Sequence, residues 1–134
     1  MSDALFPPFT VLAHRGASGL EPENTLRSFR RALELGAEWI ELDVRVVEGT
    51  PVVFHDRTLT RCTGRRGVVE RQSLHFLRSL DAGHGEKIPL FAEVLELVRG
   101  RARLQVELKG PGSAPSVAQL LSLIHISEPT RRRG

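Results

Sequence analysis

The sequence predicts an α/β fold in which short parallel strands alternate with helices. An apolar run at residues 9–13, a helical pattern at 26–33 and a second apolar run at 39–44 have the order of a βαβ unit of about 30 residues. Two more apolar runs, at 52–54 and 104–108, lie further along the chain. Each run ends in histidine, arginine or acidic residues. Because parallel strands joined by helices have their carboxyl ends at one edge, we expect these polar side chains to lie together.

The composition is that of one small globular domain. The chain has 134 residues, 40% of them hydrophobic and 26% charged, which suffices for a core and does not suggest disorder. The single cysteine, Cys62, cannot form an internal disulfide, and the N-terminus lacks the basic-then-apolar pattern of a signal peptide. No apolar run approaches the ~20 residues of a membrane span. The sequence therefore predicts a cytoplasmic protein without a membrane span.

The net charge of +3 comes mostly from the C-terminus, where Arg131, Arg132 and Arg133 outweigh Glu128. A terminal triplet does not form the extended basic face that nucleic-acid binding requires. We therefore expect no nucleic-acid partner.

The first apolar run predicts a buried strand at residues 9–13 that leads into His14, Arg15 and Gly16. The guanidinium of arginine suits a phosphate or a carboxylate, because it donates two parallel hydrogen bonds. The alternative is a surface turn that happens to carry a histidine. A helix follows, capped by Asn24 or Thr25 and ended by Gly36.

Side chains alternate between two faces along the predicted strand at 39–44. Glu41 and Asp43 therefore share one face, opposite Ile40, Leu42 and Val44. Two carboxylates on one face repel each other unless a positive group lies between them, and a divalent cation with oxygen ligands is the natural candidate. The alternative is an edge strand whose acidic face is exposed to water.

The remaining pattern places polar residues after two more strands. A turn at Gly49–Pro51 precedes a strand at 52–54 that ends in His55 and Asp56, and a histidine beside a metal can act as an acid or a base. Residues 57–72 are expected to form a polar loop, and His84 a solvated turn residue. Helices are expected at 74–80 and from Pro89 to Val98. The strand at 104–109 then carries Gln105, Glu107 and Lys109 on one face.

These motifs resemble those of the glycerophosphodiester phosphodiesterase family from about residue 9 to residue 110. The motifs are His14-Arg15-Gly16, Pro22-Glu23-Asn24-Thr25, Glu41-Leu42-Asp43, His55-Asp56 and Glu107-Leu108-Lys109. The resemblance implies a TIM-barrel fold and metal-dependent hydrolysis of glycerophosphodiesters to glycerol 3-phosphate and an alcohol. It implies that Glu41, Asp43 and Glu107 bind a divalent metal ion, Ca²⁺ or Mg²⁺. It further implies that His14 and His55 are the acid–base pair and that Arg15 and Lys109 hold the phosphate.

The chemistry of a phosphodiester agrees with that residue set. Its negative charge repels nucleophiles, and a metal with two cationic side chains offsets this charge and the additional charge of the transition state. Either histidine can be the base, and the attacking oxygen can be water or a hydroxyl of the substrate. The alternative function is a barrel module that binds phosphate or regulates without catalysis, and this needs only Arg15 and Lys109.

The resemblance ends by about residue 120, whereas a TIM barrel needs eight strands and roughly 200 residues or more. We therefore expect the chain to hold about the first four β/α units of such a barrel. Residues 1–119 would be the N-terminal portion of the domain, and residues 120–134 a tail foreign to the family, artefactual or disordered. Such a fragment is expected to have little activity alone, and the sequence leaves its oligomeric state open.

Overall fold

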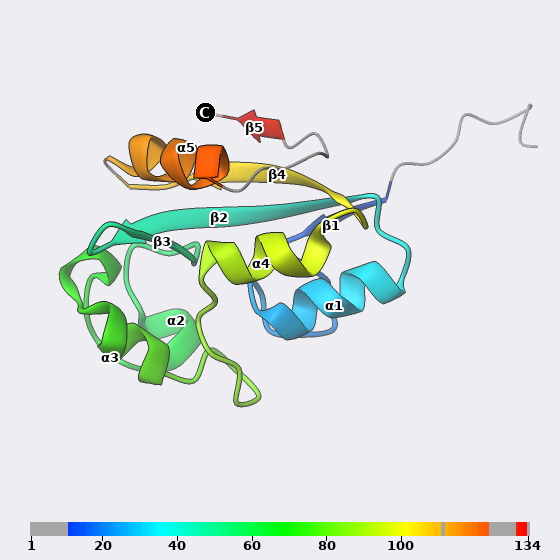
Figure 1. Cartoon of the computed structure of the whole chain (residues 1–134). Coiled ribbons are helices and arrows are strands. Elements are labelled where there is room, and N and C mark those ends of the chain that lie inside the picture. The colour runs from blue at the N-terminus through cyan, green and yellow to red at the C-terminus, as the bar shows by residue number, and fades with distance from the viewer. Residues whose placement is uncertain (1–10, 111, 124–130, 134) are drawn as a thin grey trace, which may run out of the picture.

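The structure, a computed structural model, describes residues 11–110, 112–123 and 131–133 (Figure 1). Its strands are β1 (Leu12–His14), β2 (Trp39–Val47), β3 (Thr50–Val53), β4 (Arg103–Leu108) and β5 (Arg131–Arg133). Its helices are α1 (Leu26–Glu34), α2 (Thr60–Thr63), the 3₁₀ helix η2 (Val69–Arg71), α3 (Leu74–Ser79), α4 (Phe91–Val98) and α5 (Ser113–Leu123). None of the helices in the described ranges is both long enough and apolar enough to span a bilayer.

The strands form a mostly parallel sheet in the order β1-β2-β4-β5. β1 and β4 each pair in parallel with β2, and β5 pairs in parallel with β4. β3 instead pairs antiparallel with β2 as a hairpin. The α/β fold with parallel strands is confirmed. Only the expected parallel direction of the strand at 52–54 is wrong, because β3 runs antiparallel to β2.

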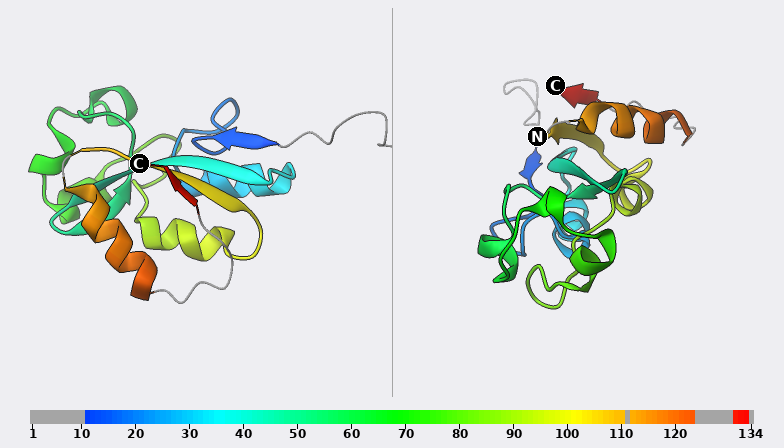
Figure 2. Two further views of the ribbon diagram at one scale, coloured as in Figure 1. Left: turned by 90° about the horizontal axis from the view of Figure 1, so that it is seen from above. Right: turned by 90° about the vertical axis from the view of Figure 1, so that its left-hand side faces the viewer.

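Helices α1, α4 and α5 cover one face of this sheet, and the main apolar core lies between these helices and the strands. Ile40, Leu42 and Val44 point from β2 into this core and are fully buried. They pack with Phe29 of α1 and Phe91 of α4, and Val117 of α5 joins the same cluster. Figure 2 shows α4 and α5 on the same side of the strands. The period-two prediction for β2 is therefore confirmed on its apolar side, and the acidic side must lie on the opposite face of the sheet.

The predicted buried strand at 9–13 differs from the structure. β1 begins only at Leu12, and residues 9 and 10 lie outside the described part of the chain. Val11 and Leu12 are 47% and 48% exposed. Within the described ranges β1 has a strand partner only on its β2 side, so an apolar sequence here does not lead to burial.

The turn between β2 and β3 lies one residue earlier than predicted. Glu48 and Gly49 have positive φ angles of 50° and 79°, so they are the two central residues of a tight hairpin turn. Thr50 and Pro51 already belong to β3. This short turn returns the chain antiparallel along β2 instead of sending it through a helix.

The predicted polar loop at 57–72 is partly ordered into α2 and η2. Leu59 and Val69 within it are fully buried, and with Val47, Val52 and Leu77 they belong to a second apolar cluster. In Figure 1, this segment and α3 lie together next to the β2–β3 hairpin. Isolated apolar residues in a polar sequence thus anchor this segment.

The predicted helices are confirmed within a residue or two at their ends. Thr25, not Asn24, caps α1, in a capping box with Ser28, and the chain turns at Gly36 with φ 85°. Ser73 caps α3, and His84 is exposed as predicted.

Helix α5 was not predicted, although Pro115 is compatible with its first turn, where backbone N–H groups have no helical acceptors. The predicted domain boundary at residue 119 falls inside α5. Residues 124–130 and 134, which include His125, lie outside the described part of the chain. The division into a family portion and a foreign tail stays a prediction.

Candidate active site

The acidic face of β2 lies at the centre of the site. Glu41 and Asp43 are 8% and 1% exposed, so both carboxylates are removed from bulk water. His14 at the end of β1 is in register with Glu41, and Glu107 of β4 is in register with Asp43. The parallel pairing therefore brings predicted site residues from three strands side by side.

Asp43 is held by two residues from the segment that follows β1. Asn24 Nδ2 donates a hydrogen bond of 3.0 Å to Asp43 Oδ2, and Arg15 Nε lies 3.5 Å from the same oxygen. Asn24 has a φ angle of 55°, a conformation that asparagine tolerates better than most residues. Arg15 Nε and Asn24 Oδ1 are both buried without a hydrogen-bond partner. Two unsatisfied polar atoms beside a buried carboxylate are unusual and indicate a functional site.

Glu41 is surrounded by the end of β1. The backbone N–H of Arg15 donates to Glu41 Oε1 at 3.2 Å, and His14 Nε2 lies 3.7 Å from that oxygen. Burial raises the pKa of the Glu41 carboxyl, and the neighbouring negative charge of Asp43 raises it further, although His14 and Arg15 oppose the shift. Ionisation of Glu41 beside Asp43 is therefore unfavourable unless a cation is added to the site.

The three predicted metal ligands do not form a closed cage in this structure. Within the described ranges, the one acid–histidine group with all ligand atoms inside 4.8 Å is Glu23, His55 and Asp56, and Glu41, Asp43 and Glu107 form no such group. The chemistry of Glu41 and Asp43 nevertheless fits a hard cation, because two buried carboxylates and the unpaired carbonyl oxygen of Asn24 are all oxygen ligands.

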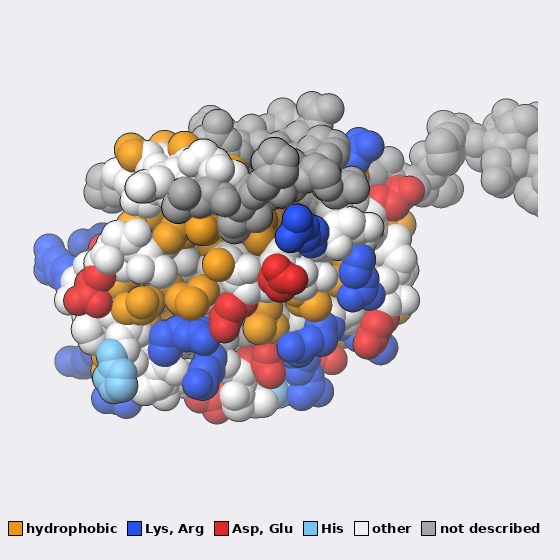
Figure 3. Space-filling view, in the orientation of Figure 1, with side chains coloured by type: hydrophobic (Ala, Val, Ile, Leu, Met, Phe, Trp, Pro, Cys, Tyr) orange, Lys and Arg blue, Asp and Glu red, His pale blue; other side chains and the backbone are white. Residues whose placement is uncertain are grey.

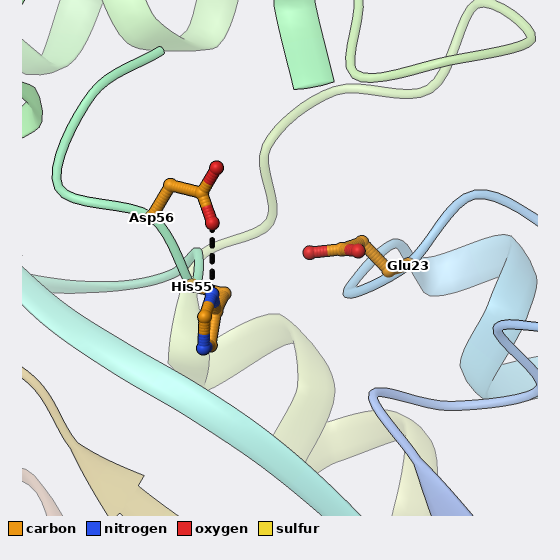
Figure 4. A group of neighbouring side chains, drawn as sticks. All are labelled: Glu23, His55 and Asp56. Atoms are coloured by element: carbon orange, nitrogen blue, oxygen red, sulfur yellow. Dashed lines mark hydrogen bonds and ion pairs between the residues drawn. The ribbon is translucent and has the colours of Figure 1, made fainter. Parts of the chain in front are cut away.

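His55 follows β3 and is fixed at both its backbone and its ring. The backbone N–H of the preceding Phe54 donates to the carbonyl of Asp43 at 3.0 Å, which brings the end of β3 back to the middle of β2. Nδ1 of the His55 ring lies 2.8 Å from Asp56 Oδ1, and Glu23 points toward this pair from the loop before α1 (Figure 4). The sequence analysis predicted that His55 follows a parallel strand. In the structure His55 does follow a strand, but that strand is the antiparallel arm of the β2–β3 hairpin.

Arg45 is a site residue that was not predicted from the sequence. It follows Glu41 and Asp43 on the same face of β2, is 7% exposed, and donates to the His55 carbonyl oxygen from Nη2 at 2.9 Å. Its Nη1 also donates to Glu70 Oε2 at 2.8 Å. The alternation Glu41-x-Asp43-x-Arg45 is visible in the sequence and could have identified it.

Arg61 and Glu23 were also not predicted as a pair, since 38 positions separate them. Arg61 donates to both Glu23 and Asp56, and Glu23 Oε1 additionally accepts from Arg15 Nη1 at 3.3 Å. Glu107 and Lys109 are partly buried, and neither side chain forms a hydrogen bond or ion pair within the described ranges. The backbone N–H of Lys109 donates a hydrogen bond to the Val44 carbonyl at 2.8 Å.

Residues 14–124 match the model of the glycerophosphoryl diester phosphodiesterase family. The chain belongs to this family. It is 44% identical over 108 residues to the glycerophosphodiester phosphodiesterase of Caldanaerobacter subterraneus, covering 74% of this chain and 44% of that protein. It is 37% identical over 133 residues to the glycerophosphodiester phosphodiesterase of Bacillus altitudinis, covering 88% of this chain and 54% of that protein. The family resemblance read from the motifs is therefore confirmed, and the family is one of enzymes.

Solved structures of glycerophosphodiester phosphodiesterases share the fold. The enzyme from Agrobacterium tumefaciens superposes with a TM-score of 0.86 at 36% identity, over 94% of this chain and 58% of that one. A phosphodiesterase from Oleispira antarctica, solved with the product sn-glycerol-3-phosphate, superposes with a TM-score of 0.85 at 34% identity, over 98% of this chain and 58% of that one. The sheet is thus part of a TIM-type β/α barrel, and the chain spans about half the length of the relatives that it matches.

Proposed function

We propose that the native protein that contains this sequence hydrolyses glycerophosphodiesters to glycerol 3-phosphate and an alcohol. The observation that supports this most directly is the juxtaposition of His14, Arg15, Glu41 and Asp43 at the carboxyl edge of the sheet in a chain of this family. The glycerol-3-phosphate product in the Oleispira antarctica relative supports the same substrate class.

Glu41, Asp43 and Glu107 are proposed to hold a divalent cation, Ca²⁺ or Mg²⁺. The buried carboxylates of Glu41 and Asp43 and the raised pKa of Glu41, due mainly to burial and then to Asp43, favour a positive group here. When bound, such a cation would offset negative charge on the phosphodiester and polarise its oxygens. Asn24 holds Asp43 in place through its Nδ2 group.

Arg15 and Lys109 are proposed to bind the phosphate. Arg15 is held between Glu23 and Asp43, and its side chain is 20% exposed, so its orientation is fixed before the substrate arrives. Preorganised donors of this kind stabilise charge that develops in the transition state without reorganising. Lys109 adds a positive charge just after the carboxyl end of the neighbouring strand β4.

His14 and His55 are proposed to transfer the protons. One accepts a proton from the attacking oxygen, and the other donates a proton to the leaving alkoxide. The two rings have different surroundings, because the His14 side chain is 62% exposed beside Glu41, whereas the His55 side chain is 30% exposed and paired with Asp56. Their assignment as acid and base stays open.

Release of choline from glycerophosphocholine by the native protein tests this function against the non-catalytic alternative. The proposal predicts multiple turnovers with a divalent cation present. Saturable binding of glycerophosphocholine without release of choline would instead identify a binding module. The cytoplasmic location, the role in lipid metabolism and the expectation of no nucleic-acid partner stay predictions. On the face shown in Figure 3, positive and negative side chains are interspersed.

A further inference from the structure

A cluster of charged residues lies beside His55 and has no assigned role. Glu23 from the loop before α1 and Asp56 after β3 face each other next to His55, with ligand atoms within 4.8 Å of one another (Figure 4). Two carboxylates and an imidazole in this arrangement resemble a cation site. In this chain a guanidinium already supplies the positive charge.

Arg61 on α2 makes four hydrogen bonds to the two acids. Its Nε and Nη2 donate to the two oxygens of Asp56 at 2.8 and 2.9 Å. Its Nη1 and Nη2 donate to the two oxygens of Glu23 at 2.9 and 2.8 Å. The planar fork of arginine allows this double bidentate contact, which a lysine ammonium cannot reproduce. Arg61 therefore joins two loops that are far apart in the sequence.

This contact determines how Asp56 can interact with His55. Asp56 is ionised near neutral pH even at the ordinary pKa of an aspartate, and the hydrogen bonds and charge of Arg61 lower that pKa further, so the carboxylate only accepts hydrogen bonds. The two hydrogen bonds from Arg61 hold this carboxylate in place beside the ring. Nδ1 of His55, 2.8 Å away, must then be the donor. In the neutral ring the proton is on Nδ1, and Nε2 is left with the lone pair that acid–base chemistry uses.

The rest of the structure fixes the backbone of His55 but not its ring. Arg45 holds the His55 carbonyl oxygen, whereas Asp56 is the hydrogen-bond partner of the ring in the described part of the chain. Arg61 has its own anchor, because Leu59, directly before α2, is fully buried in the second apolar cluster. The Arg61 side chain is 51% exposed, so its removal opens no cavity in the core.

We propose that Arg61 is a positioning residue that orients the His55 ring through Asp56 and aligns it with Arg15 through Glu23. The expected effect on kcat rests on the proposed function, whereas the expected effect on the His55 tautomer does not. Arg61 is assigned no contact with the substrate or the reacting atoms. By holding the Asp56 carboxylate against Nδ1, it favours one tautomer of His55, and through Glu23 it fixes the relative position of the two loops that carry His55 and Arg15.

The direct test is the tautomer of His55 in the native protein and in Arg61→Gln, Arg61→Lys and Asp56→Asn. Nitrogen chemical shifts of the neutral imidazole report it, with His55→Gln to assign the resonance. We expect the wild-type ring to carry its proton on Nδ1, and all three variants to shift the population toward Nε2. Arg57→Gln is the matched control, because it removes an exposed arginine of the same segment and should leave the tautomer unchanged.

Kinetics give a second readout. Arg61→Gln should lower kcat by about 10²-fold, the usual effect of misplacing a catalytic group by ~1 Å, with a change in KM of less than about threefold. Arg61→Lys should recover little of this loss, because it restores the charge without the fork. Guanidinium ion at non-denaturing concentration should recover part of the kcat lost in Arg61→Ala, since the site is half exposed and the ion restores the planar donor group.

A wild-type His55 tautomer in Arg61→Gln, or full kcat in Arg61→Lys, would overturn the proposal, because the arginine would then be an ordinary surface ion pair. If Arg61→Gln does not fold, the Arg61→Lys and Asp56→Asn variants decide the same question. Absence of any phosphodiesterase activity in the wild-type protein would refute the proposed function alone, since the tautomer measurement would still decide the role of Arg61.

Discussion

At the scale of single residues, the site combines groups that would be unfavourable elsewhere. Glu41 and Asp43 are buried on one strand face, and Asn24 Oδ1 and Arg15 Nε are buried without partners. Each feature costs folding free energy, because charges and polar groups lose hydration when they are buried. Local sites of this kind, with raised pKa values and unsatisfied atoms, are characteristic of functional positions.

Glu41→Gln should stabilise the chelated protein and abolish its activity. The pKa of Glu41 is raised, first by burial and then by Asp43, so the ionised carboxylate is destabilised in the fold, whereas a neutral amide still accepts from the Arg15 N–H. We expect the melting temperature in excess chelator to rise by a few degrees. Exposed Glu96→Gln on α4 is the control and should change neither stability nor activity. A lower melting temperature for Glu41→Gln would show that its charge is already compensated.

His14→Ala and His55→Ala should each lower kcat in the native protein by about 10²–10⁴-fold, the usual contribution of general acid–base catalysis. Neither side chain belongs to the apolar clusters, so the melting temperature should change little. His75→Ala on α3, which removes an exposed imidazole, is the matched control. Wild-type turnover by either site variant would remove that histidine from the mechanism.

At the scale of elements, the turn between β1 and α1 positions most of the site. Gly16 has a φ angle of 80°, and a Cβ there would lie 2.9 Å from the backbone carbonyl carbon of Ser28 in α1. The backbone N–H of Ala17 donates to the Ser28 carbonyl at 3.0 Å. The loop that carries Arg15 is therefore packed directly against the first turn of the helix, where a side chain at residue 16 does not fit.

Gly16→Ala should destabilise the protein by about 2–4 kcal/mol, through left-handed backbone strain and overpacking together. Gly19→Ala is an informative control, since a Cβ at that glycine would meet no heavy atom within 4 Å and its φ is not positive. Denaturant unfolding of the two variants measures the difference. Equal stability of Gly16→Ala and Gly19→Ala would contradict the packing described for this turn.

The contact of Arg61 with the two loops should depend on pH. The hydrogen bonds and charge of Arg61 lower the pKa of Asp56; burial raises the pKa of Glu23, but Arg61 and Arg15 together outweigh it and lower that pKa as well. A lowered folded-state pKa stabilises the protein above the unfolded value of ~4 and loses its contribution as pH falls below it. The stability difference between wild type and Arg61→Gln should thus be largest near neutral pH and shrink below pH ~4. A difference that does not change with pH would contradict the assigned charge states.

Elements with strong local signals were predictable from the sequence, and those that depend on distant contacts were not. The alternation in β2 identified both of its faces, and Ser73 and Gly36 marked helix ends. The direction of β3 was not predictable from its composition, because apolar runs of this length suit parallel and antiparallel strands alike. The contact of Arg61 with Glu23 spans 38 positions and follows only from the packing of two loops.

At the scale of the whole molecule, the sheet separates two functions between its faces. One face packs against α1, α4 and α5 and holds the apolar core, and the other presents Glu41 and Asp43. The hairpin β2–β3 then returns the chain so that His55 reaches the same edge as His14. The acidic side chains are consequently supported by a rigid scaffold, which is the arrangement expected of a binding site for a cation and a phosphate.

This edge of the sheet is proposed to hydrolyse a glycerophosphodiester with the help of a divalent cation. Phosphorus NMR of glycerophosphocholine incubated with the native protein tests that proposal most directly, in three samples: with excess chelator, after Ca²⁺ or Mg²⁺ is restored, and with Asp43→Asn in restored cation. We expect the glycerol 3-phosphate resonance only in the second sample. Equal production of glycerol 3-phosphate in all three samples would contradict the proposed role of the cation and of Asp43.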